Sequence, residues 1–121
     1  MEPANENRPR ISVVILALDD QQDLAASLGC VESLADEIIV GIVCFSQTTP
    51  KTQLPQAAET LHIPWQHDLS AARNACLEAA TGNWILCLDA GEVLTSDAVA
   101  EINRFIDVGA DPSQAYRLLL R

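Results

Sequence analysis

Two carboxylates that directly follow an apolar run, Asp89 and Glu92, are the side chains of this chain best placed to do chemistry. They lie three positions apart in L-D-A-G-E, and the run before them is W-I-L-C-L. If that run is a strand of an open α/β sheet, its carboxyl end is where such sheets bind ligands. Carboxylate oxygens there suit a divalent cation shared with substrate phosphates. The pattern predicts a nucleotide or metal site, with two plainer alternatives: Asp89 as a turn cap and Glu92 as an exposed surface residue.

Arg73 lies in S-A-A-R-N, upstream of the carboxylates, where it could form an ion pair with nearby acidic surface that contributes little when exposed. His62 and His67 flank I-P-W-Q and are expected in a surface loop rather than as metal ligands or general bases. Trp65, between them, is expected to pack in the core.

Three continuous apolar runs are rich in β-branched residues and predict strands that are buried on both faces. These runs are Ile11–Leu18, Glu37–Phe45 and Trp84–Leu88. A brief strand is expected at His62–Pro64 and a last one at Ala115–Leu120. The candidate carboxylates therefore follow the third strong strand.

Capping and turn residues between these runs predict four helices. Gly82 fits the position just after the third helix, where a left-handed residue often ends a helix. The expected helices are residues 20–33, residues 56–61, a segment from Asp68 or Ser70 to about Ala80, and a final one that Ser96 caps. The core-facing stripe of the third helix is expected to be Leu69, Ala72, Ala75, Cys76 and Ala79.

Strands that alternate with helices predict βαβ units and a mainly parallel sheet. We therefore expect an α/β fold: a single three-layer α/β/α domain with a mostly parallel, twisted sheet over residues 11–121. The polar residues 1–10 contain two prolines and are expected to be a disordered lead-in.

The composition excludes several classes of function. Seventeen acidic residues against seven basic ones give a formal charge of −10, which argues against binding nucleic acid or anionic membranes. There is no run of about 18 apolar residues, so no membrane span is expected. The N-terminus lacks the apolar segment of a signal peptide. The four cysteines show no C-x-x-C spacing and lie in apolar settings, which predicts buried free thiols and a cytoplasmic location.

The segment from Asp68 to Leu94 resembles the family 2 glycosyltransferases, which have the GT-A (nucleotide-diphospho-sugar transferase) fold. Members of that family carry F-S-A-A-R-N, T-G-D-W-I-L and L-D-A-D-E, and this chain has L-S-A-A-R-N, T-G-N-W-I-L and L-D-A-G-E at the same relative spacing. The upstream L-A-D-E-I-I-V and the opening I-S-V-V-I-L-A-L are also similar to the first strands of those proteins. The likeness covers about residues 11–106.

The resemblance implies that this half of the fold binds a nucleotide diphosphate sugar. It assigns Asp89 to the first carboxylate of the family's D-x-D motif, which holds Mg²⁺ or Mn²⁺ on the diphosphate, and Glu92 could supply a second ligand. It also assigns Ala17, Asp19, Arg73 and Asp89 to nucleotide-sugar binding. Arg73 could contact the base or the phosphates, since its planar fork suits phosphate oxygens. A catalytic residue is not assigned, because family members continue with a further half that supplies the acceptor site and the catalytic base.

Three departures from the family pattern leave two functions open. Gly91 occupies the second D-x-D carboxylate position, Gly41-Ile42-Val43 replaces the segment with the base-binding aspartate, and Leu18-Asp19-Asp20 replaces K-N-E. The first function is nucleotide-sugar binding with possible glycosyl transfer. The second is a non-catalytic relative that acts as a binding or assembly module, as a homodimer or with a protein partner.

Overall fold

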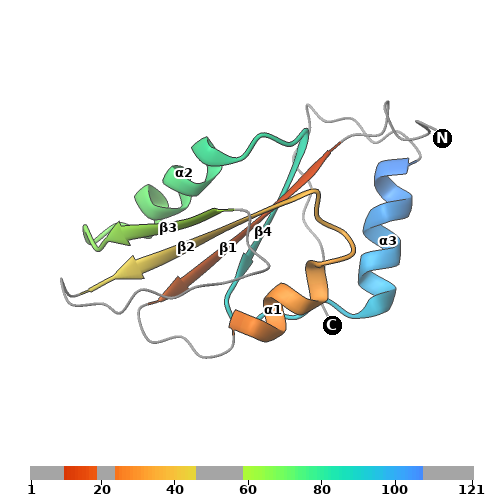
Figure 1. Cartoon of the computed structure of the whole chain (residues 1–121), viewed down its shortest axis with the longest axis horizontal. Helices are drawn as coiled ribbons and strands as arrows, with labels where there is room; N and C mark the ends of the chain where they lie inside the picture. Colours follow the sequence, from red (N-terminus) through yellow and green to blue (C-terminus); the bar gives the residue numbers. More distant parts are fainter. Residues whose placement is uncertain (1–9, 19–23, 46–58, 108–121) are drawn as a thin grey trace.

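Four parallel strands form the central sheet of the computed structural model, which describes residues 10–18, 24–45 and 59–107 (Figure 1). The strands are β1 (Ile11–Leu18), β2 (Glu37–Cys44), β3 (Glu59–Pro64) and β4 (Trp84–Asp89). Their order in the sheet is β3-β2-β1-β4, and every pair is parallel. The parallel α/β architecture expected from the sequence is confirmed.

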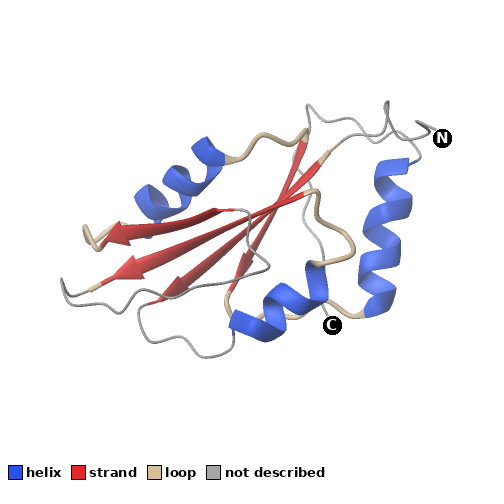
Figure 2. Cartoon of the chain, viewed as in Figure 1, coloured by secondary structure: helices blue, strands red, loops and turns tan. Residues whose placement is uncertain are grey.

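Helices cover both faces of this sheet and complete three layers (Figures 1 and 2). On one face lie α1 (Leu24–Val31) and α3 (Ser96–Asp107), and on the other lies α2 (Leu69–Ala79). Side chains alternate along a strand, so each face has its own core. The larger core, under α1 and α3, includes Ile15 and Val40, and the smaller core, under α2, includes Leu16 and Ile39.

The central strand β1 explains why its sequence is continuously apolar. It lies between β2 and β4 and is covered on both faces, so its residues from Ile11 to Ala17 are all buried. Strand β4 is different, since within the described residues it is paired only with β1: Ile85 is 40% exposed and Cys87 is exposed, although both were expected in a buried strand. These two residues face the α2 side, and α2 packs mainly over β2 rather than over β4.

The strands end at different levels, and this stagger shapes the carboxyl edge. Leu16 of β1 is paired with both Gly41 of β2 and Asp89 of β4. Strands β1 and β2 continue past this level, to Leu18 and to Cys44. Asp89 therefore lies at the end of a strand that stops short of β1 and β2.

A polar cluster ties the opposite, amino-terminal edge together. The Glu37 carboxylate accepts hydrogen bonds from the Thr81 backbone N–H (2.9 Å) and from the hydroxyl of Ser12 (2.7 Å). These bonds, led by the one from the Thr81 backbone, lower the pKa of Glu37 below its usual range. The Ser12 hydroxyl in turn accepts a hydrogen bond from the Gly82 N–H (2.8 Å).

Gly82 belongs to this cluster, and its expected role at the end of α2 is wrong. The helix ends at Ala79, and its cap residue Ala80 has extended backbone and donates its N–H to the Leu77 carbonyl at 3.2 Å. A Cβ atom on Gly82 would lie 2.6 Å from the Ser12 hydroxyl oxygen, so the glycine is needed for close approach to β1.

Three sequence expectations for the helices are corrected by the structure. Residues Glu59–Leu61 were expected in a helix, but they pair with β2 as the first half of β3, because the sheet supplies backbone partners that a short helix lacks. Leu69 was expected on the core-facing stripe of α2, but it is 47% exposed at the helix start. Thr95, not Ser96, caps α3, since its hydroxyl accepts the Ala98 N–H at 3.0 Å.

Other expectations are confirmed or lie outside the described residues. Asp68 caps α2, with its carboxylate accepting the Ser70 N–H at 2.9 Å. The first helix ends at Val31 rather than at Ser33. Its expected start at residue 20, the expected strand at residues 115–120 and the lead-in up to residue 9 fall outside the described residues. Within the described ranges, the structure contains no helix long and apolar enough to cross a membrane.

Candidate functional site

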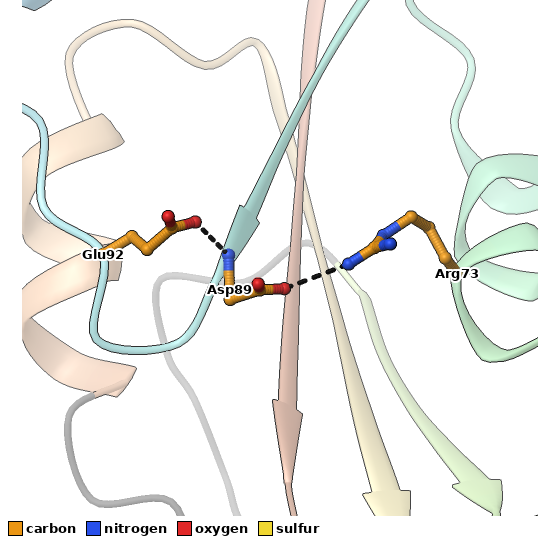
Figure 3. Close-up of polar contacts among 3 residues, drawn as sticks. All are labelled: Arg73, Asp89 and Glu92. Carbon is orange, nitrogen blue, oxygen red and sulfur yellow. Dashed lines mark hydrogen bonds and ion pairs between the residues drawn. The ribbon is translucent and has the colours of Figure 1, made fainter. Parts of the chain in front are cut away.

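An arginine and an aspartate meet at the carboxyl edge of the sheet, on the side covered by α2 (Figure 3). The Arg73 guanidinium donates a hydrogen bond to Oδ1 of Asp89 at 3.1 Å, which also forms an ion pair. Their side chains are 40% and 62% exposed, respectively. An exposed pair of this kind contributes at most about 1 kcal/mol to stability. Both side chains are therefore accessible, and separating them costs little free energy.

The position of Arg73 follows from the way α2 is seated on the sheet. Ala72 and Cys76 are buried against β1 and β2, which places Arg73 on the flank of the helix toward β4. Gly41 makes this seat possible, because a Cβ there would lie only 2.3 Å from the Cys76 sulfur. Gly41, which departs from the family pattern, therefore has a packing role and also leaves this position without a polar side chain.

The turn after β4 is held by hydrogen bonds from its own residues. Glu92 Oε1 accepts the Asp89 backbone N–H at 2.8 Å, and the Glu92 N–H donates to the Asp89 carbonyl at 3.0 Å. Gly91 has φ of 98°, in the region that side chains other than glycine rarely adopt. The positive φ of this turn therefore explains why position 91 is a glycine.

A buried serine of α1 anchors the same turn. Ser27 is fully buried, and its hydroxyl accepts the Gly91 N–H at 2.9 Å and donates to the Glu92 carbonyl at 2.7 Å. One side chain thereby satisfies two backbone groups that would otherwise lose their partners on folding. Sequence reasoning missed Ser27, because a single serine within L-A-A-S-L-G carries no signal of such a contact.

Asp89 and Glu92 do not converge. In Figure 3 the Asp89 carboxylate points toward Arg73, whereas the Glu92 carboxylate lies on the other side, against the Asp89 main chain. Among the described residues, no three His, Cys, Asp or Glu side chains gather as a metal-binding group. One exposed carboxylate does fit Mg²⁺ or Mn²⁺ that is held mainly by phosphates and water.

Of the two remaining predicted site residues, only Ala17 falls in the described part of the chain, next to the last residue of β1. Ala17 is 3% exposed and its side chain packs in the core under α1 and α3, so only its backbone could face a ligand. Asp19 lies outside the described residues. The carbonyl of Leu16, which precedes Ala17, accepts the Ala90 N–H at 2.8 Å and so fixes the turn after β4 to β1.

Three aromatic side chains at the same edge were not predicted as site residues. Phe45 directly follows β2, Trp65 directly follows β3, and His67 comes two residues later. The ring centroids of Phe45 and Trp65 are 5.4 Å apart, and those of Trp65 and His67 are 5.6 Å apart. Phe45 is 51% exposed. The available signal was that two of the chain's few aromatic residues stand directly after strands.

The four cysteines are all free. Cys87 is exposed, which corrects the expectation that every thiol is buried. Desolvation nevertheless raises the pKa of the Cys87 thiol, and burial raises the pKa of Cys76 as well. Because the thiolate is the reactive form, neither group is primed as a nucleophile at neutral pH.

Fold and charge pair together define a class: a small parallel α/β domain whose ligand edge lies at the carboxyl ends of its strands. Residues 12–112 match the family described as Glycosyl transferase family 2, and the chain belongs to this family. It is also similar to a TPR repeat-containing protein of Synechococcus elongatus, with 37% identity over 98 residues. That match covers 81% of this chain but only 24% of the relative, so the chain spans about a quarter of the relative's length.

Proposed function

We propose that this domain binds a nucleotide diphosphate sugar at its carboxyl edge, with the diphosphate between Arg73 and Asp89. The observation that carries the proposal is the accessible pair of these two side chains on the α2 side of the sheet. Membership of the glycosyl transferase family 2 supports a ligand of this class.

In this proposal the two charges of the pair have different tasks. The Arg73 fork turns from the carboxylate to phosphate oxygens, with which it can form two parallel hydrogen bonds. Asp89 then supplies one oxygen ligand to Mg²⁺ or Mn²⁺, which would neutralise the phosphates and a departing diphosphate. Glu92 keeps the Asp89 backbone in place through its hydrogen bond to the Asp89 N–H, rather than acting as a second ligand.

The second candidate function is a non-catalytic binding or assembly module. It is favoured by Gly91, because the left-handed turn leaves the family's second carboxylate position without a side chain. The relative's name refers to TPR repeats, a kind of solenoid that offers extended binding surfaces. A binding surface of that kind beside the matched segment would suit a protein partner for such a module. The free thiols support a reducing, cytoplasmic setting for either function.

Calorimetric titration with UDP, GDP and CDP, with and without Mn²⁺, tests the first proposal. We expect metal-dependent micromolar binding of at least one nucleotide. Arg73→Ala should weaken that binding at least tenfold, because the guanidinium loses its charge-assisted bonds to phosphate. Arg104→Ala is the matched control, since Arg104 is exposed and pairs with Glu101 on α3, away from the site.

The same titration separates the two candidates. Absence of heat and of a thermal shift with all three nucleotides would refute nucleotide-sugar binding. The assembly module instead predicts a dimer or larger complex whose population rises with concentration in light scattering. Equal affinities of the Arg73→Ala and Arg104→Ala variants would show that nucleotides bind elsewhere.

A further inference from the structure

The rings of Phe45 and Trp65 lie on the same side of the sheet as the Arg73–Asp89 pair. Val43 of β2 packs in the core under α2, and Phe45 continues the same alternation two residues later. Trp65 packs against this core too, and the contact between the two rings is tilted by 52°. The carboxyl edge under α2 therefore has aromatic rings at its β2–β3 end and the charge pair at its β4 end.

The sheet register sets the separation of these two ends. Asp89 is level with Gly41, and Phe45 stands four residues further along β2. Four residues correspond to about 13 Å along the strand, and the two strand spacings from β2 to β4 add about 10 Å across it. A ligand that occupies both ends must be extended, with a planar group at one end and phosphates at the other.

Phe45 has the exposure of a contact residue rather than of a core residue. Phe45 is 51% exposed, and its ring contacts that of Trp65, which packs against the apolar core under α2. Behind it, His67 packs on Trp65 and holds a backbone φ of 61°, which is uncommon for a residue other than glycine and marks a constrained loop. An exposed aromatic ring that is backed by fixed rings is suited to stacking on another π system.

The neighbouring part of β2 offers no side chain that could form a hydrogen bond with a base. Gly41, Ile42 and Val43 are buried and apolar or without a side chain. We infer that Phe45 and Trp65 form a stacking platform for the nucleobase, which is held here by its ring face. This inference rests on the proposed function and names how that same site selects its ligand.

Selection by stacking has a consequence for which nucleotide binds best. A purine presents a larger π face than a pyrimidine and therefore stacks more strongly. Stacking does not read the hydrogen-bond donors and acceptors on the edges of the base, so it distinguishes little between the two purines. GDP and ADP should therefore bind more tightly than UDP and CDP, with little difference between GDP and ADP.

The two tryptophans and two phenylalanines of the chain provide matched controls. Trp84 and Phe105 pair with each other at 6.0 Å, away from the platform. In the Trp84→Phe variant, GDP with Mg²⁺ should quench the remaining Trp65 emission, and inorganic pyrophosphate should not. In the Trp65→Phe variant, GDP should leave the emission of Trp84 unchanged.

Substitution of Phe45 gives the affinity test. Phe45→Ala should bind GDP roughly 5- to 150-fold more weakly, as expected for loss of one base–aromatic stack, and should bind pyrophosphate as before. Phe45→Trp should retain GDP affinity, which controls for folding, and Phe105→Ala should leave it unchanged.

Failure of the platform and failure of the function give different results. GDP affinity that is unchanged in Phe45→Ala but reduced in Arg73→Ala overturns the platform alone. A preference for UDP over GDP also overturns it. Absence of GDP binding by the unsubstituted protein overturns the platform together with the proposed function.

Discussion

Replacing Ser27 by alanine should destabilise the turn that carries Asp89. The Ser27 hydroxyl makes two hydrogen bonds to that turn, to the Gly91 N–H at 2.9 Å and to the Glu92 carbonyl at 2.7 Å. Each such bond contributes about 0.5–1.5 kcal/mol net, so the pair amounts to about 1–3 kcal/mol. The removed oxygen is small, so a cavity term adds little to this sum.

Urea unfolding measures this loss directly. With a slope of about 2 kcal/mol per molar, a loss of about 2 kcal/mol lowers the unfolding midpoint by about 1 M. Ser33→Ala is the matched control, because Ser33 is exposed just after α1 and should change stability by less than about 0.5 kcal/mol. The Ser27→Ala variant should also weaken nucleotide binding, since Asp89 begins the loosened turn.

A Ser27→Ala protein with the stability of the Ser33→Ala control would refute this reasoning. It would mean that water replaces the hydroxyl at both backbone groups without cost. The turn would then be held by its internal bonds, chiefly that between Glu92 Oε1 and the Asp89 N–H.

Three further predictions concern single positions. Gly91→Ala should lower the free energy of unfolding by about 1–2 kcal/mol, because the φ of 98° is strained for any side chain; unchanged thermal unfolding would contradict it. Gly41→Ala should cost about 1–3 kcal/mol by forcing a Cβ against the Cys76 sulfur, and a second change, Cys76→Ala, should recover much of the loss in urea unfolding. Glu37 has a lowered pKa in the folded state, so its stabilising effect is present above the pKa of the unfolded chain and is lost as pH falls through the folded value. Glu37→Gln should flatten the acid side of the stability–pH curve, and an unchanged curve would exclude this role.

Much of the fold could be predicted because its signals are local. The apolar run Ile11–Leu18 is continuous because β1 is buried on both faces, and Asp68 caps α2 through a bond to a residue two positions away. The position of Asp89 at a carboxyl edge follows from the same strand pattern. Family resemblance added Arg73, which the structure brings to within 3.1 Å of Asp89.

Two of the errors occurred where contacts between distant residues decide the outcome. Glu59–Leu61 became a strand because β2 offered partners, and no local pattern shows that. Gly82 is set by Ser12, seventy residues away in the chain. Trp65 does contact the core, as expected, but its pairing with Phe45 joins two segments through the sheet register. The part of the site that depends on neighbouring strands was therefore the part that sequence alone left out.

The glycine turn after β4 also limits how the edge can be redesigned. The φ of 98° at Gly91 and the bond from its N–H to Ser27 make the two positions interdependent. An aspartate at position 91 would require a different backbone path, and the buried Ser27 hydroxyl would then lose the N–H that it accepts. Building a second carboxylate into this edge therefore requires substitutions at both positions together.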